Sequence, residues 1–285
     1  MRKRLKERLT FLSSEELEKV YSSFDIIGDI AIVKHNNLTN PQVVAQEILK
    51  IHKNIKAVFT PKTRIKTDFR IRKLQLLAGE NRTKTTHRES GCVFKVDVEK
   101  CYFSPRLSFE HSRIANIVTS SEIVVNMFAG VGCFSIFIAK NHPQTRVYSI
   151  DLNSEAIEFT KENINLNKVG ATVIPLLGDS KDLIQNALFG IADRVLMPLP
   201  EKALEYLPYA LLAIKKSGGW IHYYDFQHAK GEENPVDRTK KKLTQRLNEL
   251  GAKYCFTNSR VVRRTGPNWY QTVIDIKVDK FPNKF

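Results

Sequence analysis

Hydrophobic positions follow two different patterns along the chain, and the pattern changes near residue 118. In the first part, apolar positions alternate over short stretches, which is typical of strands, and two stretches have helical periodicity. The helices are expected at 15–21 and 41–52, and the strands at 24–33, broken by a turn at Gly28-Asp29, and within 56–103, notably 93–98. We therefore expect residues 1–117 to form the smaller, α+β domain.

From residue 118 onward, short apolar strands alternate with amphipathic helices, and this order is typical of a doubly wound parallel sheet. The expected strands are 123–127, 146–150, 173–177, 194–196, 219–224 and 272–277. The expected helices are 133–140, 154–166, 181–188, 201–215 and 236–250. We expect residues 118–285 to form one α/β domain.

Composition excludes several classes of protein. The 285 residues are 42% hydrophobic, enough for a packed core. No apolar run approaches the roughly 20 residues that span a bilayer, and no secretory leader is recognised, so we expect a cytoplasmic protein without a membrane partner. Cys92, Cys101, Cys133 and Cys255 form no C-x-x-C pair. We expect reduced thiols and no metal site.

A strong excess of positive charge points to a polyanionic partner. Forty-five Lys and Arg residues face thirty Asp and Glu residues, which gives a net charge of +15. The basic residues are densest at 2–8, 62–73, 238–246 and 260–264. Nucleic acid is the first candidate for such a partner.

A glycine-bearing loop follows the first strand of the α/β domain. Asn126-Met127-Phe128-Ala129-Gly130-Val131-Gly132 leads into a helix, and its glycines permit a tight turn close to a ligand. The next strand ends at Asp151, where a carboxylate can accept the hydroxyl groups of a ribose. The third glycine of a dinucleotide loop is missing, because Phe134 or Ser135 stands there. A ligand with a ribose and no phosphate, such as S-adenosylmethionine, fits best.

The third strand leads into Gly178-Asp179-Ser180, where a carboxylate can accept an adenine amino group. Asp151 and Asp179 could instead cap the helices that follow them. Because the carboxyl ends of such strands meet at one edge of the sheet, two carboxylates at this spacing favour a cofactor site.

Longer motifs give a resemblance that covers nearly the whole chain. They are Phe69-Arg70-Ile71-Arg72, Ala78-Gly79-Glu80-Asn81-Arg82-Thr83, Tyr102-Phe103-Ser104-Pro105-Arg106-Leu107, Met127–Gly132, Ile150–Asn153 and Ile221–Tyr224. With these motifs the chain resembles the archaeal and eukaryotic tRNA (guanine-37-N1)-methyltransferase family, including its wyosine-synthesis branch. The resemblance implies a Rossmann-like class I methyltransferase domain that uses S-adenosylmethionine, preceded by a smaller RNA-binding domain. It also implies a monomer whose partner is the tRNA anticodon stem-loop.

The same resemblance implies roles for individual residues. Glu110 matches the general base that removes the proton of guanine N1, and Arg70 matches the arginine that stabilises negative charge on O6. Glu110 could instead pair with Arg106 or Arg113 at helical spacing. The cofactor is expected to contact His111, Phe128, Gly130, Gly132, Asp151, Leu152, Asp179, Ser180 and Pro198. RNA is expected to contact Arg70, Arg72, Asn81, Arg82 and Arg106. Trp269-Tyr270 could stack on a base or lie in the core.

The chain departs from the family pattern in three places. Asn126 replaces an acidic residue at the end of the first strand. Pro198, also expected to act in catalysis, replaces the Asn of an N-L-P-like motif and offers only its carbonyl group. Many members are expected to have a further small N-terminal domain that touches the tRNA elbow, and the resemblance leads us to expect that this chain lacks it.

These departures leave the substrate open. The first hypothesis is methyl transfer to N1 of the guanosine 3′ of the anticodon. The second is a wyosine-pathway enzyme that methylates the tricyclic base at that position, alone or in addition, or transfers an aminocarboxypropyl group. The third is an RNA-binding protein without catalysis, against which the intact Asp151, Asp179 and Glu110 argue.

Overall fold

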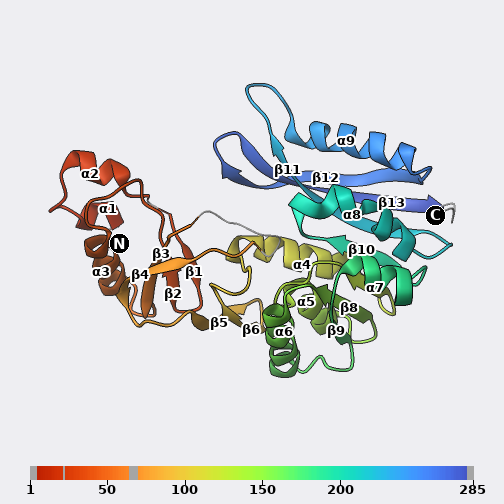
Figure 1. Cartoon of the computed structure of the whole chain (residues 1–285), viewed down its shortest axis with the longest axis horizontal. Coiled ribbons are helices and arrows are strands. Elements are labelled where there is room, and N and C mark those ends of the chain that lie inside the picture. The colour runs from red at the N-terminus through yellow and green to blue at the C-terminus, as the bar shows by residue number, and fades with distance from the viewer. Residues whose placement is uncertain (1–4, 22, 64–69, 281–285) are drawn as a thin grey trace. The chain divides into compact units, whose positions relative to one another are not determined.

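The computed structural model describes residues 5–21, 23–63 and 70–280, and these form two compact units (Figure 1). The first unit ends at Ser108 and the second begins at Phe109. The division therefore falls earlier than the expected boundary at 117/118. The reason is helix α4 (Ser108–Ile117), which lies almost wholly in the second unit and buries Ile114 and Ala115 there.

In residues 5–21, 23–63 and 70–108, the first unit combines a mixed sheet with three α-helices and a separate hairpin. Its four-stranded sheet has the order β1-β2-β3-β4, and β5 pairs with β6. The strands are β1 (Asp25–Ile27), β2 (Ile30–Ile32), β3 (Ala57–Pro61), β4 (Leu74–Gly79), β5 (Lys84–Glu89) and β6 (Cys92–Asp97). The helices are α1 (Leu5–Arg8), α2 (Ser14–Lys19), α3 (Pro41–Ile51) and the 3-10 turn η1 (Pro105–Leu107). The expected α+β organisation is confirmed.

Helix α3 begins where the sequence predicts. Pro41 occupies its first turn, where a missing N–H costs nothing, and Val44 and Ile48 turn a buried face toward the sheet. Val44 and Ile48 belong to the hydrophobic cluster that also contains Ala31 and Val58 of strands β2 and β3. This packing makes α3 the main cover of the small sheet.

The second unit is a seven-stranded sheet with the order β12-β13-β11-β10-β7-β8-β9. Its strands are β7 (Ile123–Asn126), β8 (Arg146–Asp151), β9 (Val173–Leu177), β10 (Arg194–Met197), β11 (Gly219–His228), β12 (Lys253–Gly266) and β13 (Trp269–Lys280). Its other helices are α5 (Cys133–Asn141), α6 (Ser154–Asn167), α7 (Ser180–Ala187), α8 (Pro200–Ala213) and α9 (Pro235–Glu249). The expected doubly wound α/β domain is confirmed.

Two features of this sheet differ from the expectation. Strand β12 was not predicted, and β13 runs antiparallel to β11 rather than parallel. No helix crosses between β12 and β13; the tight turn after Gly266 joins them as a hairpin, and a hairpin requires antiparallel strands. The first five strands of this sheet along the chain, β7 to β11, pair with one another in parallel.

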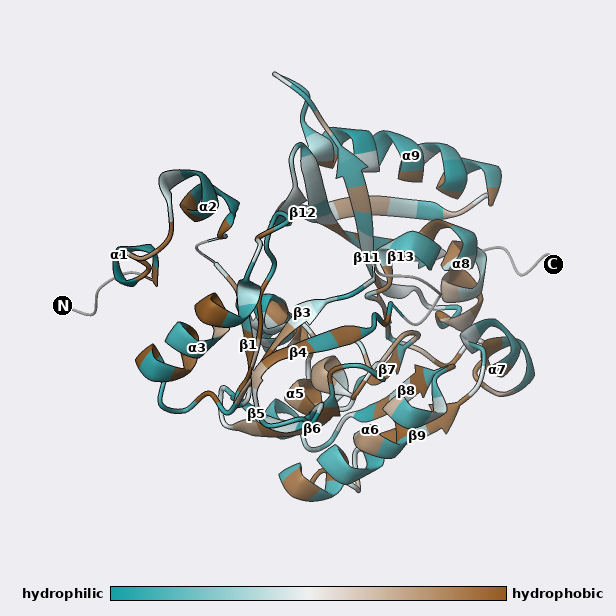
Figure 2. Cartoon of the chain, turned by 60° about the vertical axis from the view of Figure 1, so that its left-hand side comes forward, coloured by the Kyte–Doolittle hydropathy of each residue, from teal (hydrophilic) through white to brown (hydrophobic). Residues whose placement is uncertain are grey.

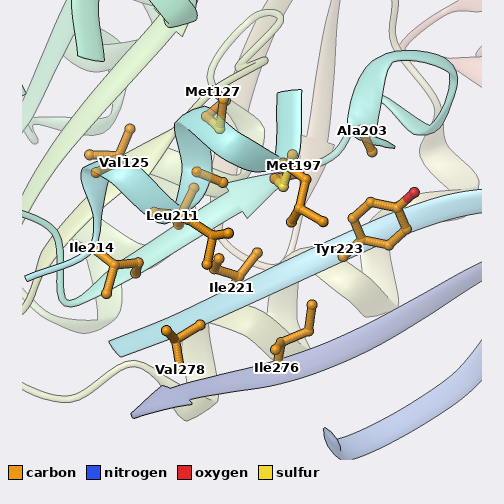
Figure 3. Packing of buried hydrophobic residues seen from close by; sticks show 14 of the residues in the cluster. Val125, Met127, Met197, Ala203, Leu211, Ile214, Ile221, Tyr223, Ile276 and Val278 are labelled. Carbon is orange, nitrogen blue, oxygen red and sulfur yellow. The ribbon is translucent and has the colours of Figure 1, made fainter. Parts of the chain in front are cut away.

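The larger core lies on the sheet face covered by α7, α8 and α9. Figure 3 shows Val125, Met197, Ile221, Ile276 and Val278 of the strands, and Met127 directly after β7, together with Ala203 and Leu211 of α8. Helix α9 is largely hydrophilic (Figure 2), and its buried positions are Val236, Thr239, Leu243 and Leu247. Alternate strand residues point to the opposite face, where α4 and α5 pack.

Truncation of this core is expected to destabilise the fold. Leu211 is 1% exposed, and Leu211→Ala should lower the free energy of unfolding by about 2–5 kcal/mol, since a cavity remains. Leu166 on α6 is 45% exposed, and Leu166→Ala should change it by no more than about 0.5 kcal/mol. Urea unfolding of both variants checks this, and equal losses would contradict the assignment of the core.

Candidate active site

The expected cofactor residues gather at one edge of the large sheet. Strands β10, β7, β8 and β9 are neighbours in that order, and all run parallel. Their carboxyl ends therefore carry, side by side, Pro198, the loop 127–132, Asp151 and Asp179. Open α/β sheets bind ligands at this edge.

The loop after β7 owes its shape to two glycines. Gly132 begins α5 with a φ of +90°, and a Cβ there would lie 3.1 Å from Thr160 Cγ2 and 3.3 Å from Ile136 Cδ1. Gly130 has a φ of +57°, its N–H donates to Asp151 at 2.7 Å, and its carbonyl accepts from Thr160 Oγ1 at 2.9 Å. The loop is thus fixed against both β8 and α6.

Asp151 has acceptor capacity left for a ligand. It accepts the N–H groups of Gly130 at 2.7 Å and Asn153 at 2.9 Å. An ionised carboxylate has about four lone-pair positions, and with the N–H of Leu152 also directed at it, about one remains for a ribose hydroxyl. Burial raises the pKa of Asp151, and N–H donors from Asn153 and Gly130 partly offset that rise. The alternative role as helix cap is wrong here, because Asn153 caps α6.

Asp179 does cap a helix. One oxygen accepts the N–H of Lys181 at 2.9 Å at the start of α7, and the other accepts the hydroxyl of Tyr206 at 3.0 Å. The capping interpretation is therefore confirmed for this residue, and it fixes the carboxylate at the sheet edge. The next residue, Ser180, is 2% exposed, and its Oγ has no hydrogen-bond partner in the described part of the chain. A buried hydroxyl without a partner suits a ligand with polar ring atoms.

Apolar side chains flank these carboxylates. Leu152 is 51% exposed and Leu177, which lies opposite Asp151 in the sheet, is 56% exposed. Phe128 packs edge-on against Tyr206, with ring centroids 5.2 Å apart. Leu177, Tyr206 and Thr160 were not among the predicted site residues. An apolar residue next to a strand-end carboxylate was the signal for Leu177, whereas nothing in the sequence linked Tyr206 or Thr160 to the loop.

Of the two unusual residues, Asn126 is the last residue of β7 and Pro198 directly follows the neighbouring strand β10. Asn126 lies opposite Leu196 in the sheet, and Met127 donates its N–H to the Leu196 carbonyl at 3.0 Å. The Asn126 side chain is fully buried and donates to Ser135 Oγ at 3.2 Å, and Ser135 contacts Ser149 Oγ at 2.9 Å. The amide N–H of Asn126 is thus bound within the protein, whereas its Oδ1 has no hydrogen-bond partner among the described residues.

Glu110 lies on α4 and is 1% exposed. It accepts hydrogen bonds from Arg113 at 3.1–3.3 Å and from the Tyr224 hydroxyl at 2.7 Å, and it forms an ion pair with Arg260. Pairing with Arg113 is confirmed and pairing with Arg106 is wrong, since Arg106 binds Asp25 at 2.6 Å. These contacts surround the buried carboxylate with two guanidinium groups and one hydroxyl donor.

His111 follows Glu110 and is also buried. Its ring packs edge-on against Phe134 with a centroid distance of 4.7 Å, and it lies 5.6 Å from the ring of Phe137. Both aromatic residues belong to α5, which begins directly after the glycine loop. The contact joins α4 to the helix of the expected cofactor site.

In the first unit, Arg70 and Tyr102 bring two of the sequence motifs together. The Arg70 guanidinium lies 4.1 Å from the centre of the Tyr102 ring, and the side chain is 9% exposed. Its backbone has a φ of +54°, a conformation that is unusual for a residue with a side chain. Phe69 and much of the basic run 62–73 lie outside the described residues.

The remaining RNA-binding candidates have structural contacts of their own. Arg82 pairs with Asp29 and with Glu80, and its guanidinium also donates to the Lys84 carbonyl at 2.8 Å. Arg72 is partly buried and Asn81 is exposed. The Glu-Asn-Arg-Thr string is therefore explained in part by the contacts of Arg82 with Asp29, Glu80 and Lys84, and RNA contact stays a prediction.

Basic and aromatic side chains mix on the β12–β13 hairpin. Arg260 lies 4.6 Å from the centre of the Phe109 ring and Arg264 lies 5.9 Å from that of Tyr270. Trp269 is 47% exposed and packs against His228. The core interpretation of Trp269 is wrong, which leaves its ring available for stacking.

Other chemistry is sparse. In residues 5–21, 23–63 and 70–280 no group of His, Cys, Asp and Glu side chains is placed to hold a metal ion, and no helix has the length and apolar character to cross a membrane. All four cysteines are free thiols; Cys92, Cys101 and Cys133 are buried and Cys255 is exposed.

The strand order, the glycine loop and the strand-end carboxylates define a Rossmann-like class I methyltransferase that depends on S-adenosylmethionine. Residues 85–251 match the TRM5/TYW2 methyltransferase domain, and residues 1–83 match the TYW2 N-terminal domain. The chain belongs to the TRM5/TYW2 methyltransferase family.

Individual relatives agree with this membership. The chain is 40% identical to the tRNA (guanine(37)-N(1))-methyltransferase Trm5b of Pyrococcus abyssi over 90% of this chain and 75% of that protein. It is 34% identical to the tRNA 4-demethylwyosine(37)-methyltransferase Taw21 of Saccharolobus solfataricus over 93% of this chain and 97% of that protein. A solved complex of aTrm5 and tRNALeu has a TM-score of 0.84 at 34% identity, covering 98% of this chain and 79% of that one.

Loss of the Asp151 carboxylate is expected to weaken cofactor binding. Asp151→Ala should lower the affinity for S-adenosylmethionine by about tenfold or more, because ribose hydroxyls lose a charged acceptor. The wild-type affinity should fall as the pH is lowered, and earlier than an exposed aspartate would dictate, because burial raises the pKa of Asp151. Calorimetry measures both effects. The exposed Asp182 on α7 supplies the control Asp182→Ala, and equal affinities for the two variants would refute the role.

Proposed function

We propose that this enzyme transfers a methyl group from S-adenosylmethionine to N1 of the guanosine at tRNA position 37, 3′ of the anticodon. The buried carboxylate of Glu110, in the domain that carries the cofactor loop, is the observation on which the proposal rests. The 40% identity to a protein named for this reaction supports it, as does the similarity to a structure that contains tRNA.

The cofactor site is proposed to use the strand ends described above. Asp151 would accept the ribose hydroxyls, Asp179 and Ser180 would contact the adenine, and Leu152 and Phe128 would pack on its rings. His111, Gly130, Gly132 and Pro198 are proposed to complete the lining. When bound, the cofactor supplies an electrophilic methyl group on a sulfonium and leaves as a neutral thioether.

The substrate side requires a base, since N1 of guanine carries a proton at neutral pH. Glu110 would accept that proton as the bond from N1 to the methyl carbon forms and the bond from sulfur to that carbon breaks. Arg70 would stabilise the negative charge that moves to O6. Because Glu110 is 1% exposed, one of its partners must move before the guanine can reach the carboxylate. Arg260, with 28% of its side chain exposed, is the more accessible cation, whereas Arg113 is 11% exposed.

The tRNA itself is proposed to bind through charge and stacking. The net charge of +15 and the basic residues of α9 and β12 suit the phosphates of an anticodon stem-loop, and Arg70, Arg72, Asn81, Arg82 and Arg106 remain candidates in the first unit. The reactive base would have to leave its stack, as is usual in the reading of single-stranded RNA. We expect a monomer that acts in the cytoplasm.

Replacement of the proposed base should slow the chemistry and spare the cofactor. Glu110→Gln keeps the size of the side chain but cannot accept the proton, so kcat should fall by about 100-fold or more while cofactor affinity stays the same. Mass analysis of a tRNA transcript, incubated with labelled cofactor and digested, identifies the product as N1-methylguanosine. Glu158→Gln, on the exposed face of α6, is the control. A normal rate in Glu110→Gln would show that Glu110 is not the general base.

A second candidate function has its own support. Pro198 stands where N1-guanosine methylating relatives carry Asn, residues 1–83 match the TYW2 N-terminal domain, and the chain covers 97% of the Taw21 sequence. Methylation of the tricyclic wyosine precursor at position 37, alone or in addition, is the alternative. Transfer of an aminocarboxypropyl group from the same cofactor is a further form of it.

Position 198 should influence the choice between these bases. Pro198→Asn restores a side chain that can donate and accept hydrogen bonds, so the rate on guanosine relative to the tricyclic base should rise about fivefold, the worth of one hydrogen bond. Competition between the two tRNA substrates measures this ratio. Pro143→Asn, in an exposed loop before β8, is the control. An unchanged ratio would show that Pro198 does not affect the choice of substrate.

A further inference from the structure

A continuous line of buried charged and polar groups crosses the α4 side of the large sheet. Its successive contacts are Glu122–Arg194 at 2.6 Å, Arg194–His222 at 2.7 Å, His222–Asp275 at 2.6 Å, Asp275–Arg113 at 2.6 Å and Arg113–Glu110 at 3.1 Å. Each of these side chains is at most 12% exposed. The line ends at the carboxylate that is proposed to be the base.

The line fixes where the protons lie. An arginine only donates, so Nε2 of His222 must accept from Arg194, and the ring proton sits on Nδ1, which donates to Asp275. Burial lowers the pKa of His222, in keeping with a neutral ring. Although burial raises the pKa of Asp275, hydrogen bonds from His222 and Arg113 bring it well below the usual range for an aspartate. Asp275 is therefore expected to be ionised at neutral pH.

Arg113 connects this anion to Glu110. Its guanidinium donates to Asp275 at 2.6 and 3.2 Å and to Glu110 at 3.1–3.3 Å, so its planar fork spans two carboxylates. Asn258 holds Asp275 from β12 at 3.2 Å, and Tyr224 donates to Glu110 from β11 at 2.7 Å. The charges in the line, with Arg260, balance: Glu110, Glu122 and Asp275 against Arg113, Arg194 and Arg260. Protonation of Glu110 would leave one positive charge in excess.

Stability alone gives a weak account of this arrangement. Buried ion pairs can often be replaced by apolar residues at little or no cost in stability, because desolvation cancels much of the attraction. The opposite face of the same strands carries an apolar core with Ile221, Tyr223 and Ile274, and a single ion pair between Asp225 and Lys242 lies near the end of β11. The longer line of linked charges lies on the side of Glu110.

We propose that Arg113, Asp275 and Tyr224 are positioning residues that hold Glu110 ionised and in one orientation for proton transfer. The inference rests on the proposed role of Glu110 as the base. Loss of Arg113 would leave two buried carboxylates unpaired and would endanger the fold, so Tyr224 offers the cleaner test. Tyr224→Phe removes one hydroxyl group and keeps the packed ring.

The control is the neighbouring residue. Tyr223 is equally buried but points to the apolar face, away from Glu110, so Tyr223→Phe should leave catalysis unchanged. In Tyr224→Phe the kcat for methyl transfer should fall about tenfold, with unchanged KM for tRNA, because the carboxylate loses a hydrogen bond of the charged kind. The acidic limb of the rate profile should move up by about one pH unit, since a donor that stabilised the ionised form is gone.

A second measurement does not depend on activity. Infrared difference spectra of the free protein against Glu110→Gln report the titration of the Glu110 carboxyl group. A higher midpoint in Tyr224→Phe than in the wild type, with Tyr223→Phe unchanged, supports the inference. Equal midpoints, or equal kinetic effects in both tyrosine variants, overturn it. If the wild type methylates no guanosine, the proposed function fails, while the infrared midpoints still decide whether the network controls Glu110.

Discussion

A carboxylate that is 1% exposed can stay charged only if other groups replace the water that it has lost. For Glu110 these groups come from four different elements: Arg113 from its own helix, Tyr224 from β11, Arg260 from β12 and, through Arg113, Asp275 from β13. The contacts of Glu110 therefore depend on the position of α4 on the sheet, on the polar face beneath it and on the antiparallel β12–β13 hairpin.

The cofactor side depends on a different and simpler constraint. Parallel neighbouring strands bring their carboxyl ends to one edge. The direction of the strands alone therefore brings together the residues that follow β7, β8, β9 and β10. Backbone N–H groups then fix the Asp151 carboxylate, because Gly130 and Asn153 both donate to it. This is why the spacing of Asp151 and Asp179 along the sequence sufficed to predict the edge on which they lie.

The elements that sequence reasoning missed share a physical cause. Strand β12 has exposed or half-buried positions along its whole length, since it is the edge strand, and so it shows no alternation of apolar and polar residues. Helix α4 buries Glu110 and His111 on its inner face, so its periodicity is not hydrophobic. Buried polar groups are stabilised by partners far along the chain, such as Tyr224, which is 114 residues from Glu110. No local sequence pattern contains that information.

The residues that depart from the family pattern can be interpreted in the same terms. Asn126 is sealed beneath the loop and bound to Ser135, so its effect on a substrate can only be indirect, through the shape of the loop. Pro198 is partly exposed at the end of the next strand and changes which hydrogen bonds that edge can offer. The two changes are adjacent in the sheet but unequal in consequence. We therefore propose that the partly exposed position 198 influences the choice between the two nucleobases, whereas Glu110, as the proposed general base, would serve any substrate that must lose a proton.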